Sequence, residues 1–167
     1  MSTKNDKTNV MRLLDGAGIE YKVYTFDAEA VPSGSKTADL LGIDHDAMFK
    51  TLVTVGTALA GKPAPHYVFV IPVDSVLDLK KAAKAAKDKS VEMVKSKELL
   101  PLTGYIHGGC SPIGMKKPFK TFVDETAQLF DTIVFSGGRV GHMVEVSPED
   151  LAKMIDFEYF DLTVDSI

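Results

Sequence analysis

The sequence predicts an α+β (mixed α/β) fold with a curved, barrel-like central sheet, mixed or antiparallel, and helices around it. Segments with the two-residue periodicity of strands outnumber helical ones, and the two kinds do not alternate in the regular rhythm of a parallel βαβ fold. The 167 residues are 45% hydrophobic and 25% charged, which suits a globular domain with a sizeable core. We therefore expect residues 1–167 to form a single domain.

The N-terminal elements follow from apolar spacing and turn composition. A helix is expected over 10–17, where apolar residues recur at intervals of three and four. Residues 20–26 are rich in aromatic and β-branched side chains and predict a strand, whereas 28–36 have the composition of a loop. A short helix follows, with Ser35 or Thr37 as its cap.

Two strands and a helix are expected in the middle of the chain. Residues 49–55 alternate between two faces and carry Lys50 near their start, and 67–73 are apolar on both faces, as in a central strand. The loop over 56–66 joins them, so the two strands should pair. Residues 79–86 then form a helix with one apolar and one basic face.

The second half of the chain is predicted as short strands separated by helical turns. Short helices are expected from Ser96 and over 125–129, and Ser147 followed by Pro148 is a clear helix start. The tail over 156–164 mixes apolar and acidic residues and predicts no element. The strands are expected at 91–94, 120–124, 132–136 and 142–146.

The stretch Thr103 to Gly114, TGYIHGGCSPIG, combines four glycines with a proline, a serine and the only cysteine of the chain. Glycine and proline disfavour helix and strand interiors, so a shaped loop is expected. Gly108 and Gly109 can direct consecutive N–H groups into one hollow that receives an anion or a polarised carbonyl. The alternative is an ordinary tight turn, which Gly-Gly pairs also form.

Composition excludes several kinds of site. Because Cys110 is the only cysteine, neither an internal disulfide nor a zinc site built on cysteines can form. The four histidines are scattered without metal-ligand spacing, and we expect no metal and no cofactor. No apolar run reaches the roughly 20 residues that cross a bilayer, and the polar start lacks the apolar stretch of a signal peptide. The expectation is a cytoplasmic protein without membrane association.

The net charge of −4 argues against broad, non-specific adhesion to nucleic acid, but it allows a local basic patch. Lysines gather on and after the expected helix over 79–86. They form either a solvated helix face or a basic platform for a polyanion. These lysines are Lys80, Lys81, Lys84, Lys87, Lys89, Lys95 and Lys97.

No GxSxG elbow, Walker loop, GxGxxG fingerprint or HExxH helix occurs in the sequence, so the common motif-based mechanisms have no starting point. A strand lysine, two Gly-Gly pairs and scattered hydroxyls remain. This set favours an enzyme that binds and polarises its substrate, with backbone N–H groups stabilising an oxyanion and a lysine holding a phosphate or carbonyl. The strand pattern alone favours a solvent-facing Lys50 over a site lysine.

The sequence resembles the YbaK/EbsC family of aminoacyl-tRNA deacylases, relatives of the editing insertion of bacterial prolyl-tRNA synthetases. Four blocks carry the resemblance in the same order across residues 10–155: FKTLV, LDLKKAAKA with VEMV after it, TGYIHGGCSPIG, and VFSGGRVGHMVEV. The resemblance implies a mixed α/β fold with a barrel-like sheet, and hydrolysis of amino acids wrongly attached to tRNA. The most similar subgroup removes cysteine from proline tRNA, so Cys-tRNA(Pro) is the implied substrate.

The resemblance also implies roles for single residues. Lys50 matches the family's lysine, which lines the pocket and meets the terminal nucleotide or the ester. Gly108 and Gly109 match the glycine loop whose amides face the aminoacyl carbonyl, and these three are the expected catalytic residues. The expected substrate-binding residues are Phe26, His107, Cys110, Ser111, Pro112, Ser136, Gly137 and Gly138.

Two positions depart from the cysteine-specific subgroup: Phe26 replaces a tyrosine, and Met143 replaces an acid. Both changes remove polar contacts. Alanine- or serine-charged tRNA is therefore an alternative substrate, because small apolar differences discriminate by only about 1–3 kcal/mol. An alternative of another class is a non-catalytic module that binds aminoacyl-tRNA or an amino acid and acts with a synthetase.

A protein nucleophile is not required for this chemistry. An aminoacyl ester is already activated, and water, a ribose hydroxyl or a substrate thiol can attack it. No base partner can be named for Cys110, so its thiol is expected to be incidental, and His107 is either a pocket wall or a plain loop side chain. The expected partners are the acceptor end of mischarged tRNA and prolyl-tRNA synthetase; the oligomeric state stays open.

Overall fold

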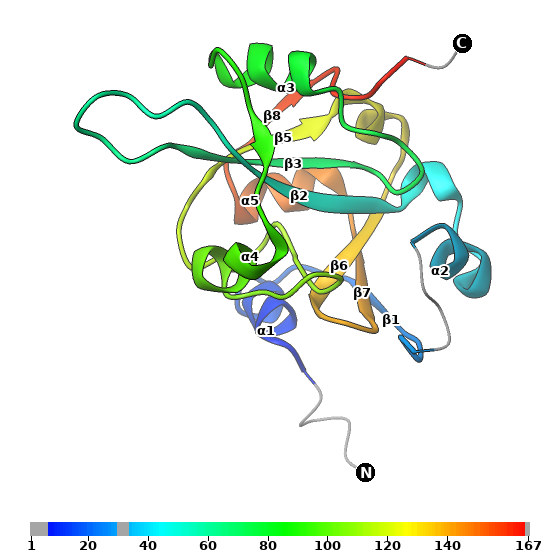
Figure 1. Ribbon diagram of the computed structural model, residues 1–167. Coiled ribbons are helices and arrows are strands. Elements are labelled where there is room, and N and C mark those ends of the chain that lie inside the picture. The colour runs from blue at the N-terminus through cyan, green and yellow to red at the C-terminus, as the bar shows by residue number, and fades with distance from the viewer. Residues whose placement is uncertain (1–6, 30–33, 166–167) are drawn as a thin grey trace.

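The computed structural model describes residues 7–29 and 34–165, and Figure 1 shows the path of the chain through them. The loop expected over 28–36 lies partly outside the described residues, and its last three residues are helical, because α2 begins at Gly34, before the predicted caps Ser35 and Thr37. The helices are α1 (Asn9–Gly16), α2 (Gly34–Leu41), α3 (Leu79–Ala86), α4 (Ser96–Thr103) and α5 (Pro148–Met154), with 3₁₀ turns η2 (His45–Ala47) and η3 (Glu125–Leu129). The strands are β1 (Lys22–Thr25), β2 (Phe49–Val55), β3 (His66–Pro72), β4 (Glu92–Met93), β5 (Lys120–Asp124), β6 (Ile133–Arg139), β7 (His142–Val146) and β8 (Glu158–Phe160).

The larger sheet has five strands in the order β4-β2-β3-β5-β8. β2 and β3 pair antiparallel along their full length, with Phe49 opposite Pro72, which confirms the expected pairing. Residues 68–71 of the central strand β3 are fully buried, and this explains why the strand is apolar on both faces. β5 pairs in parallel with β3 and with β8, so the sheet is mixed, as predicted.

The smaller sheet has three antiparallel strands in the order β1-β7-β6. Among the described residues, an isolated parallel bridge between Met48 and Val134 links it to the larger sheet. The predicted α+β class is therefore confirmed, but the barrel-like closure is wrong, because the two sheets meet at one corner and do not form a ring. The outer strands of the larger sheet are short, since β4 has two residues and β8 has three.

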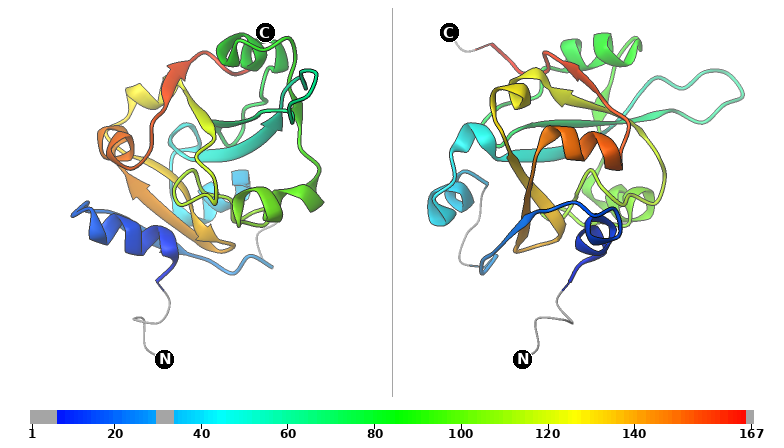
Figure 2. Two further views of the ribbon diagram at one scale, coloured as in Figure 1. Left: turned by 90° about the vertical axis from the view of Figure 1, so that its left-hand side faces the viewer. Right: turned by 180° about the vertical axis from the view of Figure 1, so that it is seen from behind.

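The main hydrophobic core lies between the two sheets, where Leu14, Phe49 and Phe135 are at most 1% exposed. Helices α1 and α5 close it; α5 lies behind the larger sheet in Figure 1 and faces the viewer in the right-hand view of Figure 2. A second core forms under α3, whose alanines pack on Phe69 and Phe122. Burying each of these large apolar side chains contributes about 1.5–3 kcal/mol.

Two predicted helix starts are confirmed. Ser147 Oγ accepts the N–H of Asp150 at 3.1 Å, and Pro148 occupies the first helical position of α5. Asp78 likewise caps α3, accepting the N–H of Lys80 at 2.9 Å. In the described part of the chain, no helix has the length and apolar character that crossing a bilayer requires.

The second Gly-Gly pair lies inside a strand, whereas the sequence predicts it after the strand. β6 runs to Arg139, and its pairing with β7 shifts register between Ser136 and Arg139, which is a β-bulge. Gly138 has a φ of +96°, and a Cβ there would lie 2.9 Å from a methyl group of Val10. Gly137 and Gly138 therefore let the strand bend and approach α1.

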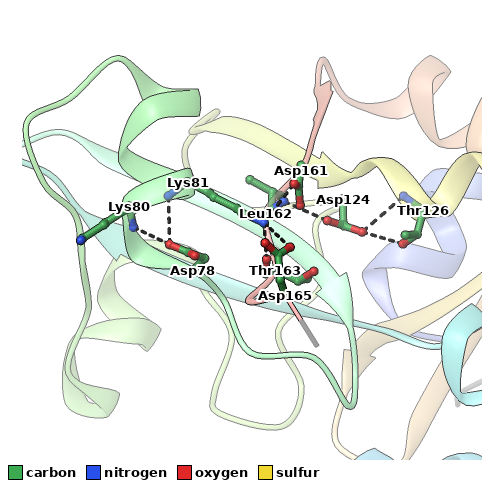
Figure 3. Close-up of polar contacts among 9 residues, drawn as sticks. All are labelled: Asp78, Lys80, Lys81, Asp124, Thr126, Asp161, Leu162, Thr163 and Asp165. Carbon is green, nitrogen blue, oxygen red and sulfur yellow. Dashed lines mark hydrogen bonds and ion pairs between the residues drawn. The ribbon is translucent and has the colours of Figure 1, made fainter. Parts of the chain in front are cut away.

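The C-terminal tail contains β8, which the sequence does not predict. Its residues attach to α3 through Lys81, as Figure 3 shows. The Lys81 amine donates to the Thr163 carbonyl at 2.7 Å and pairs with Asp161 at 3.0 Å and Asp165 at 2.9 Å. This lysine of the predicted basic helix face is therefore engaged within the protein.

Asp124, at the end of β5, fixes the same tail from the other side. Its side chain is buried, and one carboxylate oxygen accepts the N–H of Leu162 at 3.0 Å (Figure 3). The other oxygen accepts the N–H and the hydroxyl of Thr126 at 3.3 and 2.6 Å. Leu162 is fully buried in the core under α3 as a result.

Candidate functional site

A cavity of ≈ 580 Å³ opens where the two sheets meet, beside the bridge between Met48 and Val134. Its walls come from the start of β2, from α2, from the loop after α4, and from the bulged region of β6 and β7. Segments far apart in the chain therefore converge on one hollow. The predicted site residues that line it are Phe26, Lys50, His107, Gly108, Cys110 and Ser136.

Lys50 lies near the start of β2, where its position in the strand directs the side chain to the cavity. The residue is half-buried, and within the described residues its amine has no hydrogen-bond or ion-pair partner. Burial lowers the pKa of Lys50, and the carboxylate of Asp74 partly opposes this shift. A desolvated, unpaired amine at a cavity wall can receive a phosphate or carbonyl oxygen from a ligand.

The loop after α4 is held in shape by Thr103 and Tyr105. α4 ends at Gly104, which has a φ of +86°. The Thr103 hydroxyl donates to the Leu99 carbonyl at 2.8 Å and accepts the N–H of Tyr105 at 3.0 Å, and the Tyr105 hydroxyl donates to the Ile113 carbonyl. These bonds fix both ends of the loop, so its tip is presented to the cavity in a defined shape.

At the tip of this loop the two glycines differ. Gly108, with a φ of +87°, lines the cavity, whereas Gly109 does not. The N–H of Gly109 donates to the Ile106 carbonyl at 3.0 Å, and a Cβ on Gly109 would lie 3.0 Å from the backbone nitrogen of Val140. Among the described residues no protein acceptor receives the N–H of Gly108 or Cys110. The amides of Gly108 and Cys110 are therefore available as donors at the loop tip.

The remaining predicted site residues lie outside the cavity. Ser111 is fully buried, and its hydroxyl accepts the N–H of Ile113 at 3.3 Å. Pro112 lines a second cavity, of ≈ 670 Å³, on the other side of the loop. Gly137 and Gly138 form the bulge in β6 and do not line the first cavity. Gly137 and Gly138 therefore affect the first cavity only indirectly, through the bend that they allow in β6.

The thiol of Cys110 is buried and has the Thr103 hydroxyl as a hydrogen-bond partner. Burial raises the pKa of Cys110 to about 12, so the thiol stays protonated near neutral pH and is a poor nucleophile. His107 is exposed at the rim of the same cavity. Within the residues that the structure describes, neither side chain has the hydrogen-bonded base partner that nucleophilic catalysis needs.

Thr51 is a cavity residue that the sequence analysis does not single out. Its hydroxyl is buried, and among the described residues it is the buried side-chain oxygen that has no hydrogen-bond partner. Thr51 lines the cavity next to Lys50. A buried hydroxyl without a partner costs free energy unless a ligand or water satisfies it. The sequence FKTLV contains the threonine, but that its hydroxyl is buried and unpaired becomes visible only in the structure.

A family model described as the aminoacyl-tRNA editing domain matches residues 28–154. The chain belongs to this family. Its curated relative EbsC of Enterococcus faecalis, a candidate Cys-tRNA(Pro)/Cys-tRNA(Cys) deacylase by name, is 44% identical over 158 residues, which span 94% of this chain and 93% of EbsC. The resemblance inferred from the four sequence blocks is confirmed.

Solved structures show the same fold as this editing domain. A candidate trans-editing enzyme for prolyl-tRNA synthetase superposes with a TM-score of 0.81 at 24% identity, covering 99% of both chains. The hypothetical protein APE2540 superposes with a TM-score of 0.80 at 22% identity, covering 94% of this chain and all of the other. At identities of 22–24%, these two structures show that the fold is shared and nothing further.

In this member of the editing family, an ionic cluster holds α2 at the mouth of the cavity. The His45 ring lies between two carboxylates, with Nε2 2.6 Å from Asp39 of α2 and Nδ1 2.6 Å from Asp74 after β3. These hydrogen bonds raise the pKa of His45 to about 9. The cluster ties α2, which supplies Ser35 to the cavity wall, to the end of the larger sheet.

The editing domain shows no arrangement of metal ligands in the residues that the structure describes. No group of three or more histidine, cysteine, aspartate or glutamate side chains there converges as a metal site would. The absence of a metal stays a prediction that elemental analysis of the purified protein can check. The donors that converge on the cavity are an amine, two amides and hydroxyls, which suit a carbonyl or phosphate oxygen.

Proposed function

We propose that this protein is a trans-editing aminoacyl-tRNA deacylase that hydrolyses mischarged tRNA, with Cys-tRNA(Pro) as its first substrate. Membership of the editing family and 44% identity to EbsC along nearly the whole chain support the reaction class. The observation that carries the site assignment is Lys50. Its half-buried amine is unpaired within the described residues, and it faces a cavity that also receives the loop tip at Gly108 and Cys110.

In this proposal the backbone amides of Gly108 and Cys110 bind the carbonyl oxygen of the aminoacyl ester. They stabilise the negative charge that develops on this oxygen during attack, and each well-placed donor contributes about 3–4 kcal/mol. Lys50 binds a phosphate of the terminal nucleotides or the carbonyl itself. Gly109 acts indirectly, because its N–H closes the turn that aims the neighbouring amides.

Hydrolysis needs no protein nucleophile. Water adds to the carbonyl carbon, the bond from that carbon to the ribose oxygen breaks, and the ribose oxygen takes up the proton that the water loses. The products are the free amino acid and uncharged tRNA. A neighbouring ribose hydroxyl or the thiol of a cysteinyl substrate is an alternative attacking group, and the neutral Cys110 thiol is a bystander.

The cavity walls that we expect to face the amino-acid side chain give little polar selection. Phe26, Val140 and Met143 line it with apolar surface, and such a wall separates similar side chains by only about 1–3 kcal/mol. Alanine- and serine-charged tRNA are therefore the second candidates.

The test is to incubate the protein with proline tRNA charged in turn with cysteine, alanine, serine and proline, and to follow loss of the ester. We expect the fastest hydrolysis with cysteine and none with proline. Cys110→Ala should keep turnover within about twofold of wild type, since a buried neutral thiol takes no part. Tight binding of all four charged tRNAs without any hydrolysis would replace this proposal with the non-catalytic module.

The partners that we propose are the acceptor end of mischarged tRNA and prolyl-tRNA synthetase. The structural neighbour named as a trans-editing enzyme for that synthetase supports the second partner through fold only. The cytoplasm, where tRNA is charged, is the compartment that fits this role. Adding the synthetase to the assay tests whether it changes the rate at which the ester is lost.

A further inference from the structure

Charge is distributed unevenly along this acidic chain. Residues 80–120 carry ten of its 19 lysines and arginines but only three of its 23 acidic residues, a net charge of +7 in a chain of net −4. In Figure 1 this green segment runs from α3 at the top, through β4, to α4 lower down. The basic segment therefore covers one side of the molecule, and its two ends have different surroundings.

The α3 end lies away from the candidate site. α3 covers the five-stranded sheet, and none of its residues lines the ≈ 580 Å³ cavity. Its Lys81 is engaged by Asp161 and Asp165. Lys84 and Lys87 are exposed on this helix and its cap, without ion pairs in the described part of the chain.

The other end carries exposed lysines on α4 and on the loop and strand that follow it, and we call this the α4-loop surface. Its lysines are Lys95, Lys97, Lys116, Lys117 and Lys120. Two of them, Lys117 and Lys120, line the ≈ 670 Å³ groove on the other side of the loop from the candidate site. The backbone joins its two halves, because the N–H of Lys116 donates to the Thr103 carbonyl at the end of α4 at 3.0 Å. Glu98 of α4 and Lys117 of the loop both act electrostatically on His66, so the two segments converge there.

All five lysines of the α4-loop surface are exposed, and within the described residues none has an ion-pair partner. Glu98 is the only acidic residue between 95 and 120, and its carboxylate already accepts the N–H of Lys95 at 3.3 Å. The surface ends at Asp156 and Glu158, which line the far side of the ≈ 670 Å³ groove. An acidic boundary limits where an anion can lie.

The α4-loop surface is continuous with the candidate site. Leu99 of α4 lines the ≈ 580 Å³ cavity, and so do Gly108 and Cys110 of the loop. The same two segments thus present apolar groups and amides to the cavity and lysines to solvent. An aromatic side chain, Phe119, lies among the lysines, with its ring 5.6 Å from that of His66.

We propose that the α4-loop surface binds the phosphates of the tRNA acceptor stem while the aminoacylated 3′ end occupies the cavity. This inference rests on the proposed function. Unpaired lysines are the residues that neutralise RNA phosphates without reading sequence, and their place on segments that also line the cavity matches a substrate whose charged stem continues from its reacting end. The acidic remainder of the protein repels the rest of the tRNA and leaves this face as the point of approach.

The test compares two double variants in the surface, Lys95→Gln with Lys97→Gln and Lys116→Gln with Lys117→Gln, with a matched control on α3, Lys84→Gln with Lys87→Gln. Binding of uncharged tRNA is followed by fluorescence anisotropy between 50 and 200 mM salt. Each surface variant should weaken binding roughly tenfold at low salt and reduce the slope of log K against log salt by about 1–2. The control should change binding less than about twofold.

Hydrolysis separates this inference from the proposed function. The surface variants should raise KM for charged tRNA more than they lower kcat, and they should lose far less activity on a cysteinyl ester of adenosine, which has no acceptor stem. Equal losses in the α3 control, or unchanged tRNA binding by both surface variants, would overturn the inference while wild-type hydrolysis persists. If the surface variants lose affinity for prolyl-tRNA synthetase instead of tRNA, the surface binds protein and the inference is wrong. Failure of wild type to hydrolyse any charged tRNA would sink the proposed function instead.

Discussion

Two lysines in this protein have opposite surroundings. Lys81 joins α3 to the C-terminal tail and has three oxygen partners within 3.0 Å. The carboxylates of Asp165 and Asp161 raise the pKa of its amine. Lys50 is half-buried, has no such partner in the described residues, and has its pKa lowered by burial. Folding gives the Lys81 amine direct oxygen partners, whereas the Lys50 amine has only the more distant charge of Asp74 to offset its burial.

The difference separates structural from functional polar groups. A desolvated charge without a partner costs folding free energy, so it persists where a ligand supplies the partner. Thr51 repeats the pattern in the same cavity, and Asp124 repeats the satisfied pattern at the tail. The comparison predicts that substitutions at Lys50 affect turnover, whereas those at Lys81 and Asp124 affect stability.

Lys50→Met gives the largest effect that we expect. It keeps the aliphatic stem and removes the charge, so turnover of Cys-tRNA(Pro) should fall about 100-fold or more. The Tm should be unchanged or higher, because the folded state no longer holds an unpaired, desolvated amine. Single-turnover deacylation and thermal unfolding measure the two quantities. Turnover within threefold of wild type would contradict the functional role assigned to Lys50.

Asp124→Ala should lower the free energy of unfolding by about 2–3 kcal/mol, since it leaves the buried N–H of Leu162 without an acceptor. Turnover measured well below the Tm should stay unchanged. Asp124→Asn is the matched control, because its amide oxygen can still accept that N–H and should retain part of the stability. Urea unfolding measures both variants; an alanine variant as stable as wild type would contradict the assigned role.

Lys81→Met should lower the Tm by less than Asp124→Ala does. The acidic partners Asp161 and Asp165 are exposed, and surface ion pairs contribute little because water and salt screen them. Thermal unfolding at low and high salt measures this effect, and the difference from wild type should shrink as salt increases. A loss of turnover without a change in Tm would show that Lys81, like Lys50, acts in function and not in stability.

His45→Gln should make stability less dependent on pH. The pKa of His45 is raised to about 9 by Asp39 and Asp74, whereas an unfolded histidine titrates near about 6.5. The imidazolium therefore stabilises the fold fully below about pH 6.5, and this contribution is lost as the pH rises through about 9. The Tm of wild type should fall more than that of His45→Gln over this range, and an NMR titration of His45 with a midpoint near 6.5 would contradict the assignment.

Local sequence patterns predicted the helices and strands whose periodicity is visible within a short stretch of sequence. Residues 49–55 and 79–86 form β2 and α3 with the predicted bounds, because a two-residue or helical alternation is visible within a short window. β8 cannot be predicted from such a window, because it has only three residues and forms through its pairing with β5, which is distant in sequence. The Gly137-Gly138 bulge likewise depends on β7 and α1, which lie elsewhere in the chain.

The residues of the candidate site were predicted more completely from the family's sequence motifs than from periodicity or composition. Lys50, Gly108 and Cys110 meet at one cavity, but their convergence joins segments about which periodicity says nothing. The distinction between the two loop glycines needed the turn that uses the N–H of Gly109. Thr51 could not be recognised because its lack of a partner is a property of its neighbours. Their roles in catalysis remain for the experiments above.

The tail that Lys81 and Asp124 hold also constrains how the protein folds as it leaves the ribosome. Synthesis runs from the N-terminus, so β5 and α3 are made long before Leu162 and the β8 strand that complete them. Until residues 158–163 emerge, β5 presents an open strand edge, the kind of surface through which nascent chains pair with one another. Burial of Leu162 under α3 and pairing of β8 with β5 can therefore be completed only late in synthesis, and these two events cover the open edge of β5.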